Sequence, residues 1–88
     1  MKIKNTFILR NVAGSNIVLP IGASSANFSG MLKLNETGVF LWENLKKEIT
    51  EEDLVNAMLA EYNVASEQAR EDVKEFLNTL RTAGVLEE

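Results

Sequence analysis

The chain has 88 residues, 45% of them hydrophobic, and its formal net charge at pH 7 is −4. It contains neither cysteine nor histidine, which excludes disulfides, thiolate chemistry, imidazole general bases and the common zinc ligand sets. The length suits one domain over residues 1–88 and leaves little material for a second core. Most catalytic constellations are therefore excluded, and we expect a single small domain that is not an enzyme and that has no cofactor and no metal site.

Hydrophobic residues are spread along the chain. The longest apolar runs, such as Val39 to Trp42, fall far below the roughly 20 residues that a transmembrane helix needs. The N-terminus also lacks the hydrophobic stretch of a signal peptide. We therefore expect a cytoplasmic protein.

Charge is distributed unevenly between the two parts of the chain. Residues 1–35 hold four basic residues and no acidic residue, which gives +4, whereas residues 36–88 hold five basic residues against 13 acidic ones, which gives −8. Either the two parts attract each other and are otherwise solvated, or the basic part receives a partner segment that carries carboxylates.

The first third of the chain predicts extended structure. Residues 7–12 are rich in β-branched and large apolar side chains, residues 13–16 form a turn signal, and residues 17–21 form a second extended run. Pro20 cannot donate a backbone hydrogen bond, so the second strand should end its pairing or face solvent there. After a polar loop, residues 31–34 predict a third strand that leads directly into a helix.

Three helices are predicted after the strands. Asn35 is a good N-cap for a helix over 36–47, and Thr50 caps a helix over 51–62 whose acidic first turn suits the helix dipole. Ser66 caps a helix over 67–83, which ends at Gly84, a residue suited to the left-handed conformation that follows a helix. The predicted fold class is α+β: a winged-helix-like, three-stranded antiparallel sheet followed by three helices.

This element order has more than one functional interpretation. A winged helix-turn-helix protein would insert its last helix into DNA, but that helix is rich in acidic residues and lies in the −8 part of the chain, which a duplex repels. A small sheet with an open edge can instead accept an extended peptide, because its unpaired N–H and C=O groups pair with an added strand. We favour peptide binding, with DNA binding as the alternative and an enzyme that uses carboxylates alone as a third interpretation.

Several segments carry a resemblance to a known family. They are the run from Leu34 to Glu43 with its Leu-Asn-x-Thr-Gly…Trp element, residues 50–54, residues 69–73 with Phe76-Leu77, the closing Gly84-Val85-Leu86, and the opening segments 9–14 and 17–20. Together they resemble the pyrroloquinoline quinone (PQQ) synthesis protein D family, PqqD. The match covers nearly the whole chain, and the Leu-Asn-x-Thr-Gly…Trp element is its most specific part.

The resemblance implies a function. Members of that family bind the leader part of ribosomally made, post-translationally modified precursor peptides (RiPPs), commonly as an added strand between the third strand and the third helix. They present it to a modifying enzyme, often a radical S-adenosylmethionine (SAM) enzyme, and so act as RiPP recognition elements or peptide chaperones. The implied partners are a precursor peptide and a separate modifying enzyme of the kind just described, a radical SAM enzyme, and no residue can be tied to PQQ itself. The implied peptide-binding residues are Met31, Leu32, Lys33, Leu34, Arg70, Lys74, Phe76 and Leu77.

The predicted third helix offers two borders to such a peptide. At 100° per residue, Arg70, Lys74 and Arg81 fall on one side of the apolar stripe, and Asp72, Glu75 and Thr79 fall on the other. Because no acidic residue precedes Glu36, we predict that Lys33 and the basic border receive carboxylates of the leader, with the acidic border as the alternative. An open edge can also pair with a second copy, so either a monomer or a homodimer is expected.

Overall fold

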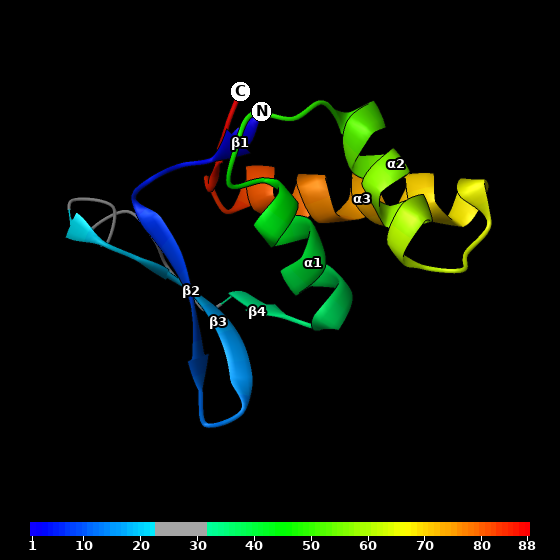
Figure 1. The fold of residues 1–88 in the computed structure, drawn as a ribbon. Coiled ribbons are helices and arrows are strands. Elements are labelled where there is room, and N and C mark those ends of the chain that lie inside the picture. Colours follow the sequence, from blue (N-terminus) through cyan, green and yellow to red (C-terminus); the bar gives the residue numbers. More distant parts are fainter. Residues whose placement is uncertain (23–31) are drawn as a thin grey trace.

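A three-stranded antiparallel sheet forms the first layer of the computed structural model, which describes residues 1–22 and 32–88 (Figure 1). Its strands are β2 (Phe7–Val12), β3 (Ser15–Pro20) and β4 (Leu32–Leu34), in the order β2-β3-β4. Strand β3 is therefore central, and β4 is an edge strand. The far end of the β2–β3 hairpin projects away from the helices. This confirms the predicted three-stranded antiparallel sheet.

The turn between β2 and β3 is tighter than the sequence indicated. Ala13 and Gly14 both have positive φ, 52° and 84°, as a two-residue type I′ hairpin turn requires. Strand β3 therefore begins at Ser15, two residues before the predicted start. Of the predicted third strand, Leu32 to Leu34 form β4, and Met31 lies outside the described residues.

The three helices are α1 (Glu36–Asn44), α2 (Glu51–Glu61) and α3 (Ser66–Thr82). The Asn35 Oδ1 atom accepts the Gly38 N–H at 2.8 Å and the Thr50 Oγ1 atom accepts the Asp53 N–H at 3.1 Å, which confirms both predicted caps. The cap predicted at Ser66 is wrong, because Ser66 is already helical and the N-cap is Ala65, which makes no side-chain hydrogen bond.

Helix α1 ends at Asn44, three residues earlier than predicted. Leu45 is the C-cap, and its N–H shares the carbonyls of Leu41 and Trp42. Its side chain is fully buried, so the chain leaves the helix here to place Leu45 in the core.

Helix α3 ends in a Schellman motif. Gly84 has φ 74° and donates to the Arg81 carbonyl, and Val85 donates to the Leu80 carbonyl, each at 3.0 Å. The chain then turns back onto the core, where Val85 is fully buried. Its last segment, β5 (Leu86–Glu87), pairs with β1 (Lys2–Ile3), so the two termini lie side by side (Figure 1). The sequence did not predict this two-stranded pair, because two residues are too few to carry a periodic pattern.

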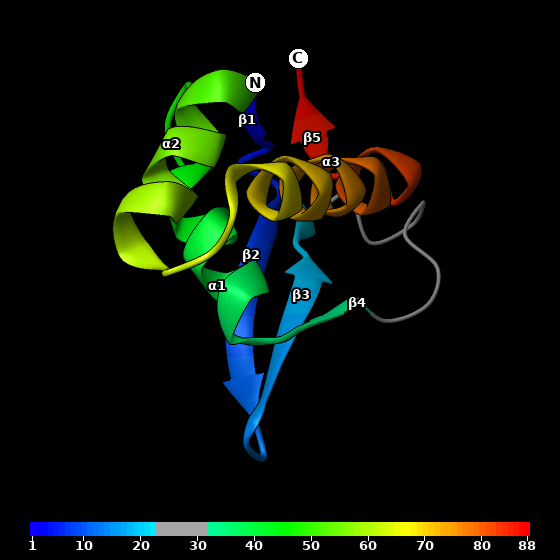
Figure 2. The ribbon, with the colours of Figure 1, turned by 90° about the vertical axis from the view of Figure 1, so that its right-hand side faces the viewer.

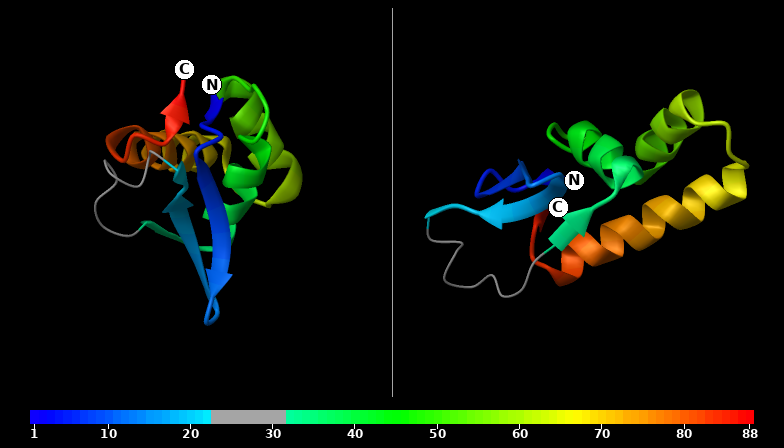
Figure 3. Two further views of the ribbon diagram at one scale, coloured as in Figure 1. Left: turned by 90° about the vertical axis from the view of Figure 1, so that its left-hand side faces the viewer. Right: turned by 90° about the horizontal axis from the view of Figure 1, so that it is seen from below.

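One hydrophobic cluster joins the sheet to the helices. Strands contribute Phe7, Val18 and Leu34, and helix α3 lies across the sheet with Val73 and Leu77 fully buried (Figure 2). Trp42 of α1 is 1% exposed and belongs to the same cluster. Seen from below, α3 runs past β4 at the edge of the sheet (Figure 3), and this juxtaposition creates the candidate site.

Candidate functional site

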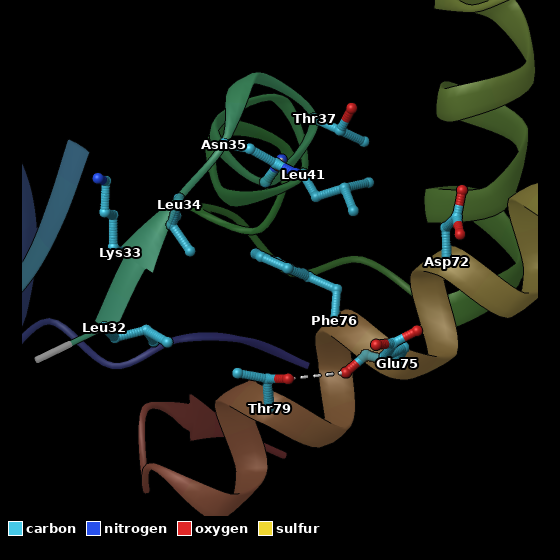
Figure 4. Close-up of a pocket in the computed structure, with 11 residues that line it drawn as sticks. Leu32, Lys33, Leu34, Asn35, Thr37, Leu41, Asp72, Glu75, Phe76 and Thr79 are labelled. Atoms are coloured by element: carbon cyan, nitrogen blue, oxygen red, sulfur yellow. Dashed lines mark hydrogen bonds between the residues drawn. The ribbon is translucent and has the colours of Figure 1, made fainter. Parts of the chain in front are cut away.

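A groove of about 640 Å³ lies between β4, the beginning of α1 and the middle of α3 (Figure 4). It is open to solvent along its length and combines an apolar floor with polar rims. Its lining residues come from three elements that are far apart in sequence: Leu32, Lys33, Leu34, Asn35, Thr37, Gly38, Leu41, Asp72, Glu75, Phe76 and Thr79.

The floor of the groove is built around the Phe76 side chain. Phe76 is half-buried and packs against the core cluster, and it points from α3 toward Leu34 of β4 (Figure 4). Gly38 of α1 permits this packing, because a Cβ atom there would lie 3.3 Å from Phe76 Cε1 and 3.2 Å from Leu34 Cβ. The structure thus brings the Phe76 ring close to the backbone of α1 at Gly38.

The free edge of β4 has one residue whose backbone groups point outward. The Ile21 N–H donates to the Thr6 carbonyl at 2.8 Å, which fixes the alternation of hydrogen-bonded pairs in the antiparallel ladder. In this register, alternate residues of β3 bond to β2, and the residues between them, Asn16 and Val18, bond to β4. Their partners Leu34 and Leu32 therefore form backbone hydrogen bonds with β3. The N–H and C=O of Lys33 therefore face the groove side, and no described residue pairs with them.

The Lys33 side chain points the other way. In the register of the sheet, Lys33 lies opposite Ile17 on the face away from the core, whereas Leu32 and Leu34 lie on the core face. Figure 4 shows the Lys33 chain extending away from α3. Lys33 thus offers the groove its backbone, while its ammonium group is directed to the outer face of the sheet.

The helical rim of the groove is acidic. Asp72, Glu75, Phe76 and Thr79 recur at the three- and four-residue spacing that puts side chains on one face of a helix, and all four line the groove. The Thr79 hydroxyl donates to the Glu75 carbonyl of its own helix at 3.1 Å, which leaves the two carboxylates as the charged groups on this rim. Helical spacing was the signal that could have grouped these residues with Phe76.

The predicted basic border lies outside this groove. Arg70 donates two hydrogen bonds to the Glu52 carboxylate of α2, at 2.7 and 2.9 Å, and Arg81 binds Glu88. The hydrogen bonding from Arg70 is the main cause that holds the pKa of Glu52 below its usual value, and the positive charge of Arg70 acts in the same direction. Lys74 is exposed and does not line the groove. On α3 these cations point roughly opposite to Asp72 and Glu75, since both sets share a helix but differ by about half a turn.

The structure therefore brings together only part of the predicted site. Leu32, Lys33, Leu34 and Phe76 meet in the groove, Arg70 and Lys74 do not line it, and Met31 is outside the described residues. Leu77 is fully buried, so it supports the groove from within the core rather than facing a ligand. The geometry replaces the predicted basic rim with the acidic one.

The outer face of the sheet is a second surface with a distinct character. Ile8, Ile17 and Leu19 share it with Arg10 and Lys33. None of the three apolar residues belongs to the core cluster, although Ile17 is only 6% exposed. Val12, 53% exposed, lies on the same face, and Ile21, 42% exposed, directly follows it. These seven residues, called the outer face below, are apolar with two cations and no acid.

The part of the chain that the structure describes has neither a metal-ligand cluster nor a membrane-spanning helix. Within residues 1–22 and 32–88, no group of three or more acidic residues, cysteines or histidines is placed to hold a metal ion. No helix in the same residues combines the length and the apolar character that crossing a bilayer requires.

Comparison with known proteins gives both a fold and a family. The chain superposes on TbiB1, solved in complex with the TbiA(beta) leader peptide, with a TM-score of 0.77 and 24% identity over 99% of this chain and 95% of that one. It also superposes on lasso peptide synthetase B1, solved with its leader peptide, with a TM-score of 0.72 and 18% identity over 96% and 93% of the two chains. No curated protein sequence matches the chain. The model of the Coenzyme PQQ synthesis protein D (PqqD) family matches residues 11–86, and the chain therefore belongs to the PqqD family.

Proposed function

We propose that this chain binds the leader segment of a ribosomally made precursor peptide and presents it to a separate modifying enzyme, with no chemistry of its own. The observation that carries the proposal is the free backbone of Lys33 beside an apolar groove. Main-chain pairing to such an edge supplies affinity for any extended peptide, and the groove beside it supplies the choice of side chains.

Similarity to known proteins supports the same function. Both structural neighbours were solved with leader peptides bound, and they share the sheet and helices that form the groove here. DNA binding, the alternative interpretation, has no comparable support. The face of α3 that lines the groove carries Asp72 and Glu75, and carboxylates repel phosphates.

The modifying enzyme needs a surface of its own, and we assign it the outer face. Four apolar side chains there, Ile8, Val12, Leu19 and Ile21, are partly or largely exposed, and Arg10 and Lys33 add positive charge without any acid. An enzyme surface that pairs an apolar centre with carboxylates complements this face. Because the groove opens on the other side of β4, an enzyme bound to the outer face leaves the leader accessible.

A binding experiment on the groove floor tests the proposal. A fluorescent synthetic leader, taken from the precursor peptide encoded beside this chain, is titrated with the protein while anisotropy is recorded. Phe76→Ala should weaken binding about tenfold or more, because about 1.4 kcal/mol of apolar contact corresponds to a factor of ten. Lys74→Ala on the same helix, outside the groove, is the matched control and should bind like the wild type. Equal affinities for all three proteins contradict the proposed site.

A further inference from the structure

Two carboxylates on the groove rim have no cation to balance them. The described residues form four salt bridges, and none involves Asp72 or Glu75. Asp72 accepts a hydrogen bond from the neutral Gln68 amide at 2.8 Å. The pair thus presents two negative charges to whatever occupies the groove.

The nearest candidates for balancing cations are engaged or directed elsewhere. Arg70 is held by Glu52 and Arg81 by Glu88, both away from the groove. The Lys33 ammonium group extends to the outer face. Lys74, on the same helix, is exposed and does not line the groove. The helical rim therefore presents negative charge to a ligand.

We infer that the leader carries a lysine or arginine, flanked by apolar residues on the same face of its strand, and that Asp72 and Glu75 bind this cation. The inference rests on the proposed leader binding. Residues three apart on a helix lie about 5–6 Å apart at Cβ, so one cationic group can reach both carboxylates. The apolar neighbours on the same face of the added strand then lie over Phe76 and Leu34 (Figure 4). This leader chemistry is opposite in sign to the one that the sequence predicted.

A charge-reversal cycle tests the inference. Each lysine and arginine of the fluorescent leader is replaced singly by glutamate, and every peptide is titrated against the wild type and against the double variant Asp72→Lys/Glu75→Lys. One of the glutamate peptides should bind the wild type about tenfold more weakly, and the same peptide should regain affinity for the double variant. The leader cation forms one ion pair with each carboxylate, and each exposed pair contributes about 0.2–1 kcal/mol. Replacing the cation by glutamate removes both pairs and adds repulsion, which accounts for a change of about tenfold.

Glu61→Lys is the control for the double variant. Glu61 is exposed at the end of α2 and does not line the groove, so its reversal changes the net charge without placing a cation beside Asp72 or Glu75. It should leave every affinity within about twofold of the wild type.

The outcomes separate the inference from the function on which it rests. If the unmodified leader binds but no cation in it matters, or if the double variant binds it as tightly as the wild type, the inference is wrong and leader binding stands. If the unmodified leader binds neither protein, the proposed function is wrong. Selection of a random dodecapeptide display library on the two proteins gives an independent readout, since wild type should enrich lysine and arginine and the double variant aspartate and glutamate.

Discussion

Gly38 determines the shape of the groove floor. Its N–H is capped by Asn35, and its missing side chain leaves room for the Phe76 ring and for Leu34. The glycine gives up some helix stability: Gly is about 1 kcal/mol less favourable than Ala in a helix interior, and Gly38, the third residue of α1, carries part of that cost. The residue therefore serves the packing of the groove rather than the helix that contains it.

Gly38→Ala should separate binding from stability. A Cβ atom 3.2–3.3 Å from its neighbours displaces the Phe76 ring by a few tenths of an ångström, so leader affinity should fall about fivefold. The free energy of unfolding should change by less than about 1 kcal/mol, because helix propensity offsets the crowding. Titration of the leader and chemical denaturation measure the two quantities.

The double variant Gly38→Ala/Phe76→Leu provides the check on this explanation. Leucine lacks the ring edge that the new Cβ atom meets, so the two substitutions should be less than additive in binding. Strict additivity would mean that Gly38 acts on the leader through something other than the ring.

Single residues were predicted well where the signal was local. The caps at Asn35 and Thr50 and the stop at Gly84 follow from backbone and side-chain chemistry within one turn of helix. The structure places the other border of α3 on the groove than the one the sequence favoured. The stripe on α3 has two borders, and the choice between them depends on which border meets β4. That contact joins elements about 40 residues apart in the chain. The count of charges before Glu36 favoured the basic border, but it holds no information on this contact.

Strand β4 is three residues long, yet it connects the site to the rest of the sheet. In its register on β3, the backbones of Leu32 and Leu34 pair within the sheet and their side chains lie on the core face. The backbone of Lys33 faces the free edge, and its side chain lies on the outer face. A shift by one residue would exchange all of these roles. The sequence predicted a strand here, but its register depends on the hairpin turn at Ala13-Gly14, which was predicted two residues too long.

The outer face can be tested apart from the groove. Arg10→Glu combined with Val12→Ser changes the charge and removes an apolar side chain that is 53% exposed, so neither folding nor the groove should suffer. Leader affinity should stay within about twofold of the wild type, whereas modification of the precursor by its purified enzyme should slow about tenfold. Thr82→Ser on the far end of α3 is a control that should leave both quantities unchanged. An unaltered modification rate in the double variant removes the outer face as the docking surface.

At the scale of the whole molecule, charge separates into two regions. The sheet part, residues 1–35, carries +4 and the helical part, residues 36–88, carries −8. The groove lies on the boundary, with its acidic rim on the helical side. A basic leader is therefore attracted to the helical side, while an acidic enzyme surface is attracted to the sheet side.

Salt should weaken leader binding by the wild type. Raising the sodium chloride concentration from about 50 mM to about 500 mM screens exposed charges and should increase the Kd several-fold. The variant Asp72→Asn/Glu75→Gln should bind more weakly at low salt and show little further change. Isothermal titration calorimetry at the two salt concentrations measures both effects. Identical salt dependence in the two proteins would contradict a role for the rim carboxylates.

Amide hydrogen exchange at Lys33 tests strand addition most directly. Its N–H faces the free edge of β4 and has no partner among the described residues, so it should exchange rapidly in the free protein and become protected when a saturating leader peptide adds its backbone to that edge. The amides of Leu32 and Leu34, which already pair with β3, should change much less. A leader that binds tightly and leaves the Lys33 amide unprotected would contradict the account.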